Sequence, residues 1–73
     1  MTPQPPEATV HFNDHPLPCP EGLTLAALLD QQGVNPARVA TALNARFVPR
    51  EARAQTPLRA GDVVVTFEAI VGG

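Results

Sequence analysis

The chain closes on a hydrophobic run, residues 63–71, that leads directly into Gly72-Gly73. The run is typical of a strand held within a sheet, and such a strand would hold the two glycines on a short tether. Glycine has no Cβ, so this end can enter a channel too narrow for other residues. The α-carboxylate of Gly73 is anionic at neutral pH and must be activated before it can act as an acyl donor. The sequence therefore predicts a small fold that presents its own end.

Length and composition narrow the class of protein. A chain of about 60 residues buries only about 60% of its unfolded surface, so these 73 residues have room for one thin core. We therefore expect no self-sufficient enzyme, no catalytic residue and no bound cofactor. The net charge is −2, with neither tryptophan nor tyrosine. Nucleic-acid binding normally requires a basic patch with stacking aromatic side chains, so no such partner is expected.

The number of cysteines and the length of the apolar runs indicate in which cellular compartment the protein is found. Cys19 is the single cysteine, which excludes an internal disulfide and gives no sign of an oxidising environment. No apolar run approaches the roughly 18–20 residues of a membrane span, and the first residues lack the features of a signal peptide. We expect a cytoplasmic protein without membrane contacts. All five basic residues are arginines, so the chain offers no lysine amine through which it could link to itself.

The first third of the chain predicts a hairpin. Residues 1–7 hold three of the nine prolines and are expected to be a disordered lead-in. Residues 8–12 alternate in hydropathy as a strand does, and Asn13-Asp14 suits a tight turn. Residues 15–19 can pair back, but their two prolines confine them to the edge of a sheet.

A helix is predicted over residues 25–32, where three leucines recur at i, i+3 and i+4 and form one apolar stripe. Thr24 suits its N-cap and Gly33 suits its C-terminal end. Three further strands are predicted after this helix. They cover residues 39–43, 47–48 and 63–67, with a turn at 44–46 and with Pro49 stopping the second. Residues 50–60 are expected to be irregular, with Leu58 anchored in the core.

This order predicts an α+β fold, a mixed four- to five-stranded sheet with one helix on one face. The first and last strands would lie side by side in the middle as a parallel pair. We expect Val63, Val65 and Phe67 to share the core-facing side of the last strand. The expected core around Leu28 consists of Val10, Leu43, Val65 and Phe67. The alternate positions of the last strand, Val64, Thr66 and Ile70, are candidates for a partner-binding face.

Five other polar or reactive side chains could form sites. Arg50 could pair with a carboxylate on a partner. Cys19 is expected to be a half-buried hydrophobe rather than a carrier of persulfide sulfur. We expect His11 and His15 to lie on the surface, because a metal site would need further ligands. Asp62 is expected to cap a turn.

The order and spacing of several motifs resemble the ubiquitin-like β-grasp sulfur carriers of thiamine biosynthesis, the ThiS family. The motifs are Phe12-Asn13-Asp14, Gly22-Leu23-Thr24-Leu25, Ala42-Leu43-Asn44, Val48-Pro49-Arg50, Gly61-Asp62 and residues 67–73. The resemblance implies a β-grasp domain over residues 8–69 and a flexible tail over 70–73. The family often has a tryptophan shortly after Val-Pro-Arg, whereas this chain continues with Glu51-Ala52-Arg53.

The resemblance also implies the chemistry and the partners. A ThiF-like adenylyltransferase would use ATP to convert Gly73 to an acyl-adenylate, with Ile70, Val71 and Gly72 threading its channel. Sulfur drawn from a cysteine desulfurase or another donor would then give a thiocarboxylate on Gly73. A ThiG-like thiazole synthase would take that sulfur for the thiazole ring of thiamine.

Three alternatives stay open at the level of the sequence. A MoaD-like sulfur carrier for molybdopterin synthase would use the same terminal chemistry for another product. A ubiquitin-like modifier would share the adenylate and then form an isopeptide bond with target proteins. A plain β-grasp interaction module would leave the diglycine inert.

Overall fold

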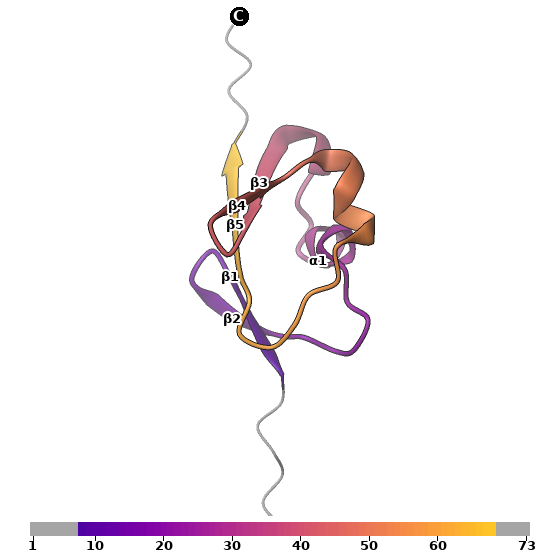
Figure 1. Cartoon of the computed structure of the whole chain (residues 1–73). Helices are drawn as coiled ribbons and strands as arrows, with labels where there is room; N and C mark the ends of the chain where they lie inside the picture. Colours follow the sequence, from indigo (N-terminus) through magenta and orange to yellow (C-terminus); the bar gives the residue numbers. More distant parts are fainter. Residues whose placement is uncertain (1–7, 69–73) are drawn as a thin grey trace, which may run out of the picture.

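A five-stranded sheet covered on one side by a single α-helix makes up the fold of this computed structural model, which describes residues 8–68 (Figure 1). The elements in chain order are β1 (Thr9–Phe12), β2 (His15–Pro18), α1 (Leu25–Gln31), the 3-10 helix η1 (Pro36–Arg38), β3 (Val39–Leu43), β4 (Arg46–Val48), the 3-10 helix η2 (Arg50–Gln55) and β5 (Val63–Glu68). The expected lead-in, residues 1–7, and the expected tail, residues 70–73, lie outside the described residues, as does the last residue of the predicted domain.

The strand order confirms the predicted mixed sheet. It runs β2-β1-β5-β3-β4, with the last strand of the chain in the centre. β5 pairs in parallel with β1 and antiparallel with β3. Both hairpins pair antiparallel, and β2 lies at the predicted edge. Because β1 and β5 are parallel, the chain between them has to cross over the sheet, and α1 lies within that crossover.

Local signals at both ends of α1 act as predicted. The Thr24 side chain accepts a hydrogen bond from the Ala27 N–H at 3.1 Å, which satisfies one of the free donors of the first turn. At the other end Gly33 has a φ of 69°. Its N–H donates to the Asp30 carbonyl, and the Val34 N–H donates to the Leu29 carbonyl. These two bonds form a Schellman motif, which ends the helix at a residue without a Cβ.

The two 3-10 helices differ from the sequence prediction. Residues 50–60 were expected to be irregular, but Arg50–Gln55 form η2. η1 was not predicted, although its signal was present: the Asn35 side chain accepts from the Ala37 N–H, and proline occupies the first helical position. The predicted core anchor Leu58 is buried, as expected.

The direction in which β5 faces was predicted wrongly. Val64 is fully buried, whereas Val63 and Phe67 are 41% and 56% exposed and Val65 is half-buried. The reason is the register, which places Val64 beside the core residue Phe12. Because both alternating sets of positions along this strand are apolar, its hydropathy could not show which set faces the helix. Val64 therefore has no exposed surface to offer a partner.

The helix stripe was predicted correctly. Leu25, Leu28 and Leu29 are fully buried, and Leu28 shares a core with Val10 and, at its margin, Leu43. The predicted contributions of Val65 and Phe67 to this core are wrong, since both side chains lie on the opposite side of the sheet from Val64. The core is thus a single layer between α1 and the sheet.

Truncation of the stripe should test this packing. Leu28→Ala is expected to lower the free energy of unfolding by about 2–5 kcal/mol, since it leaves a cavity in a core one layer thick. Urea denaturation of the purified chain measures the change. Val63→Ala removes an apolar group from an exposed position and should cost much less. Equal losses for the two variants would contradict the assignment of faces.

Candidate functional site

The site predicted from the sequence is the chain end, and the structure describes the strand that leads to it. β5 lies between β1 and β3 and continues to Glu68, which is opposite Val39 in the pairing with β3. The predicted sulfur-attachment residue Gly73 and the predicted channel-threading residues Ile70, Val71 and Gly72 lie outside the described residues. The strand that precedes them is therefore paired along one edge up to its last described position.

Two asparagine side chains bind the backbone of β5. Both occupy the first position of a two-residue hairpin turn with positive φ, 48° at Asn13 and 51° at Asn44. The Asn44 Oδ1 accepts the Val63 N–H at 2.9 Å, where the strand begins. The Asn13 Oδ1 accepts the Thr66 N–H at 2.9 Å, two residues before the strand ends. The turns were predicted at these places, but the bonds to β5 were not.

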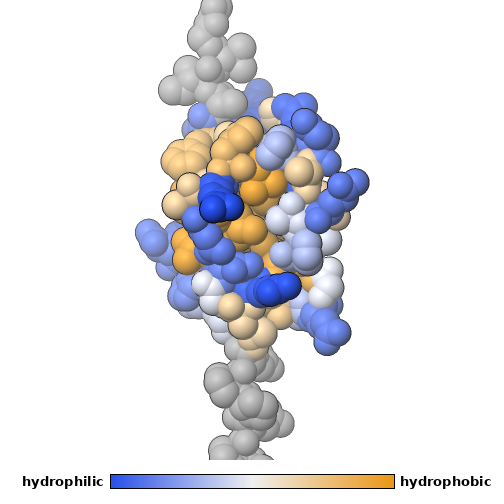
Figure 2. Space-filling view, in the orientation of Figure 1, coloured by the Kyte–Doolittle hydropathy of each residue, from blue (hydrophilic) through white to orange (hydrophobic). Residues whose placement is uncertain are grey.

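The open face of the sheet carries hydrophobic side chains on three adjacent strands, and the large exposed ones lie on β4 and β5. Phe47 of β4 is 70% exposed. It is opposite Ala42 of β3, which on its other side is opposite Val65 of β5, so the three residues form one row across the sheet. Phe67 stands in the neighbouring row, opposite Ala40. We call the set Val63, Val65, Phe67, Ala40, Ala42 and Phe47 the open apolar face. Figure 2 shows hydrophobic surface over this part of the molecule, bordered by hydrophilic residues.

Arg50 and Arg53 lie close together near the end of β5. Arg50 is exposed, and its guanidinium donates one long bond, 3.4 Å, to the Ala37 carbonyl. Arg53 is only 3% exposed. Its guanidinium donates to Thr41 Oγ1 at 3.1 Å and to two main-chain carbonyls, those of Pro36 at 2.8 Å and Val39 at 2.6 Å.

The positively charged side chain of Arg53 is almost completely buried. Burial lowers the pKa of this guanidinium, and the nearby charge of Arg50 lowers it further. A guanidinium stays protonated in proteins even so, and three neutral oxygen acceptors satisfy it here. Arg53 belongs to the stretch Glu51-Ala52-Arg53, near which the family often has a tryptophan. Its burial was not predicted, because arginine is rarely buried without a partner.

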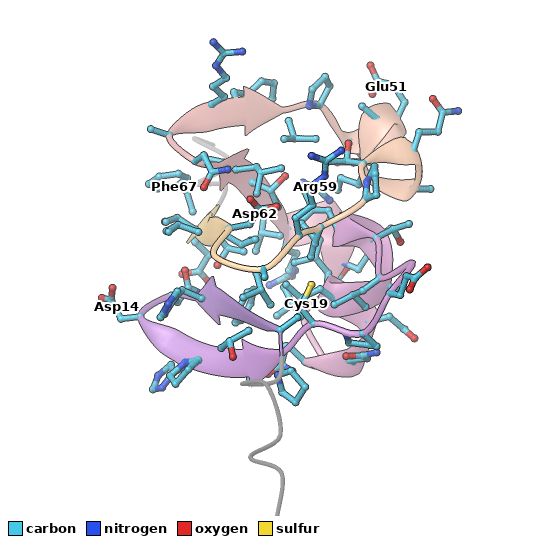
Figure 3. The ribbon with its side chains drawn as sticks, turned by 60° about the horizontal axis from the view of Figure 1, so that its bottom comes forward. Asp14, Cys19, Glu51, Arg59, Asp62 and Phe67 are labelled. Atoms are coloured by element: carbon cyan, nitrogen blue, oxygen red, sulfur yellow. The ribbon has the colours of Figure 1, made fainter. Side chains whose placement is uncertain are left out.

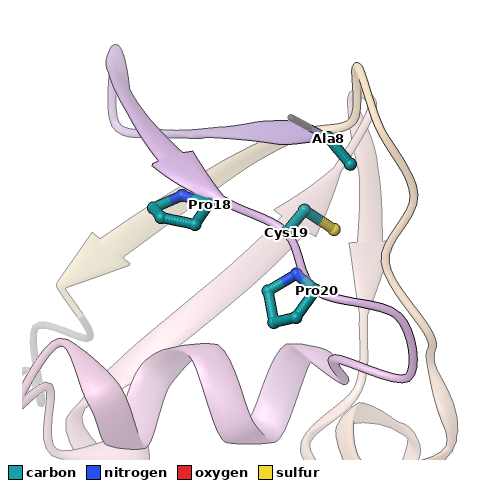
Figure 4. Close-up of a pocket in the computed structure, with 4 residues that line it drawn as sticks. All are labelled: Ala8, Pro18, Cys19 and Pro20. Atoms are coloured by element: carbon teal, nitrogen blue, oxygen red, sulfur yellow. The ribbon is translucent and has the colours of Figure 1, made fainter. Parts of the chain in front are cut away.

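Cys19 lies far from the end of β5. It follows β2, and its N–H donates to the Ala8 carbonyl beside the start of β1, whereas β5 runs parallel to β1 and ends beyond the hairpin turn. The thiol is buried and lines a mostly apolar hollow of about 430 Å³ together with Ala8, Pro18 and Pro20 (Figure 4). Burial raises its pKa, and the charge of Asp62 raises it further. The sequence prediction of a small packed hydrophobe is confirmed, although burial is more complete than expected.

The remaining predicted residues have structural or surface positions. Asp62 caps its turn: one carboxylate oxygen accepts the Arg59 N–H at 2.8 Å, and the other accepts from the Asn44 amide at 3.1 Å (Figure 3). His11 and His15 are exposed. Among residues 8–68, no group of three His, Cys, Asp or Glu side chains is placed to hold a metal ion. The same part of the chain contains no helix with the length and apolar character of a membrane span.

Comparison with known proteins decides the family. A sequence model of the ThiS family matches residues 10–73, from β1 through both glycines. The chain belongs to the ThiS family. It is 40% identical over 62 residues to the sulfur carrier protein ThiS of Escherichia coli strain K12. The match covers 85% of this chain and 94% of that protein.

A solved structure has the same fold. The crystal structure of the thiamine biosynthesis protein ThiS from Geobacter metallireducens superposes with a TM-score of 0.76. The two sequences are 28% identical, and the match covers 89% of this chain and 99% of the other. This likeness supports the β-grasp fold of the ThiS family, a five-stranded mixed sheet with one main helix, for the described residues.

The buried thiol gives a prediction about pH. Because the pKa of Cys19 is raised in the folded state, its stabilising contribution is present below the pKa of the unfolded thiol, near 8.5. The contribution is lost as the pH rises through the folded pKa, because the unfolded state ionises first. Urea denaturation between pH 7 and pH 10 should show the wild-type chain losing stability relative to Cys19→Ala. An unchanged difference between the two would contradict the burial of the thiol.

Proposed function

We propose that this chain is a sulfur carrier whose C-terminal carboxylate, on Gly73, becomes a thiocarboxylate that supplies sulfur for the thiazole of thiamine. The observation that carries the proposal is the position of β5: it is the central strand, and the chain runs from it directly to Gly72-Gly73. Membership of the ThiS family and the likeness to the sulfur carrier protein ThiS of Escherichia coli support it. The chain itself acts as a co-substrate, not as an enzyme.

The proposed chemistry takes place at the carboxylate and needs a partner at each step. In a ThiF-like adenylyltransferase, the Gly73 carboxylate oxygen attacks the α-phosphorus of ATP, and pyrophosphate leaves. The terminal sulfur of a persulfide, supplied through a cysteine desulfurase or another donor, then attacks the acyl carbon, and AMP leaves with the bonding pair. A second thiol cleaves the S–S bond, forms a disulfide with the sulfur it attacks, and releases the thiocarboxylate to a ThiG-like thiazole synthase.

The activating enzyme is proposed to dock on the open apolar face. Val63, Val65 and Phe67 of β5 belong to this face, so a protein that receives the chain beyond Glu68 is brought against it. Large exposed aromatic side chains in one patch are typical of protein contacts. Arg50 is exposed beside the end of β5 and stays our candidate for pairing with a partner carboxylate. Thr66 also stays a candidate, although its amide and hydroxyl are both hydrogen-bonded to Asn13.

Substitutions on this face test the docking. Phe47→Ala and Phe67→Ala are each expected to raise the KM of the adenylyltransferase for the carrier roughly tenfold or more, because a buried phenylalanine contributes about 1.5–3 kcal/mol. The free energy of unfolding should change little, since both rings are mainly exposed. Gln31→Ala, at the exposed end of α1, is the matched control. A KM that stays at the wild-type value in both phenylalanine variants would contradict docking on this face.

The chemistry itself is tested by mass spectrometry. With the cognate adenylyltransferase, Mg-ATP and a sulfur source, the intact chain should gain about 16 Da, the mass by which sulfur exceeds oxygen. Deletion of Gly73 should abolish the gain, because it withdraws the carboxylate by about 3.5 Å. Gly72→Val should also fail, since its side chain cannot enter a channel built for glycine. Normal modification of the Gly73 deletion would contradict the proposal.

A further inference from the structure

The backbone ladder between β1 and β5 ends before β5 does. The Asn13 N–H donates to the Val64 carbonyl at 2.9 Å, which is the last backbone bond described between them. In a regular parallel ladder the next bond would run from the Thr66 N–H to the Asn13 carbonyl. The Thr66 N–H donates to the Asn13 side chain instead, at the point where the chain enters the hairpin turn with a φ of 48° at Asn13.

The side chain of Asn13 supplies the acceptor in place of the Asn13 carbonyl. Its Oδ1 accepts the Thr66 N–H at 2.9 Å, and its Nδ2 donates to Thr66 Oγ1 at 2.9 Å. Two bonds from one planar amide fix both the position and the rotation of Thr66. On its other edge, the same residue is opposite Thr41 in the pairing with β3. β5 is therefore held on both edges as far as Thr66, and without the amide it would be held on both edges only as far as Val64.

We propose that Asn13 is a positioning residue for presentation of the chain end, an inference that rests on the proposed function. With its side chain in place, Gly73 is seven positions (73 − 66) beyond the last position held on both edges. Without it, Gly73 is nine positions (73 − 64) beyond that point. Fixing a residue in one conformation costs conformational entropy. The amide lowers this cost in advance for residues that the activating enzyme has to receive in one extended conformation.

A second asparagine provides a matched control. Asn44 has the same place in the other hairpin turn and a similar φ, and its Oδ1 accepts a β5 N–H over the same distance. Its bond is to Val63, at the opposite end of the strand from Gly73. Glycine accepts a positive φ without strain, so Asn13→Gly and Asn44→Gly each remove a side-chain amide and leave the turn intact.

The experiment compares the wild-type chain with Asn13→Gly and Asn44→Gly in two measurements. Amide hydrogen exchange should become at least about tenfold faster at Thr66 in Asn13→Gly only, and at Val63 in Asn44→Gly only. In adenylation with the cognate enzyme, Asn13→Gly should raise the KM for the carrier about three- to tenfold with little change in kcat. Asn44→Gly should leave the KM within about twofold of the wild-type value.

Thr66→Val separates the two bonds of the amide. It keeps the Thr66 N–H bond and loses the hydroxyl bond, so its KM is expected to lie between those of the wild type and Asn13→Gly. Equal KM values for the two glycine variants would overturn the proposal. Unchanged exchange at Thr66 in Asn13→Gly would overturn it too, since the bond would then not hold the strand in solution. If the wild-type chain itself gains no thiocarboxylate, the proposed function fails, and the positioning role fails with it.

Discussion

The pairing of Phe12 with Val64 determines which residues this protein buries and which it exposes. Side chains alternate along a strand, so the register of β1 against β5 sets the face of every residue in the last strand. It directs Val64 to the helix and leaves Phe67 on the open side. A slip by one residue would bury Phe67 and expose Val64, and the open apolar face would lose its largest side chain on the central strand.

The register of β5 against β3 places a polar pair at the margin of the core. Thr41 and Thr66 lie opposite each other on the helix side of the sheet, so two neighbouring strands carry hydroxyl groups where valine or leucine would be expected. Arg53 reaches this pair from η2 and donates to Thr41 as well as to the carbonyls that lead into β3. A buried guanidinium is tolerated only with such a set of acceptors. Its bonds hold the start of β3, the strand segment that is opposite Glu68.

Sequence patterns predicted most of the elements but not the features that depend on the third dimension. The Leu28 stripe, the Gly33 helix end and the turn at Asn13 each carry a local physical signal, and all three are confirmed. The facing of Val64 could not be predicted, because an apolar run has no polar side. The role of Arg53 was missed for a related reason: its acceptors come from β3 and η1, which are distant in sequence. At the candidate site, the sequence indicated the diglycine but not the asparagine amides that hold the strand before it.

The prolines of β2 have a consequence for self-association. Alternate N–H groups of β2 point towards β1, as the Cys19 bond to Ala8 shows, so the nitrogens of Pro16 and Pro18 point outwards. The outer edge therefore lacks the donors that an added strand would need. A protein with exposed phenylalanines on its sheet runs a risk of polymerisation, in which copies join edge to edge into fibrils. Here the edge of the sheet at β2 resists such extension, so the open apolar face is exposed while this route to fibrils is blocked at one of the two sheet edges.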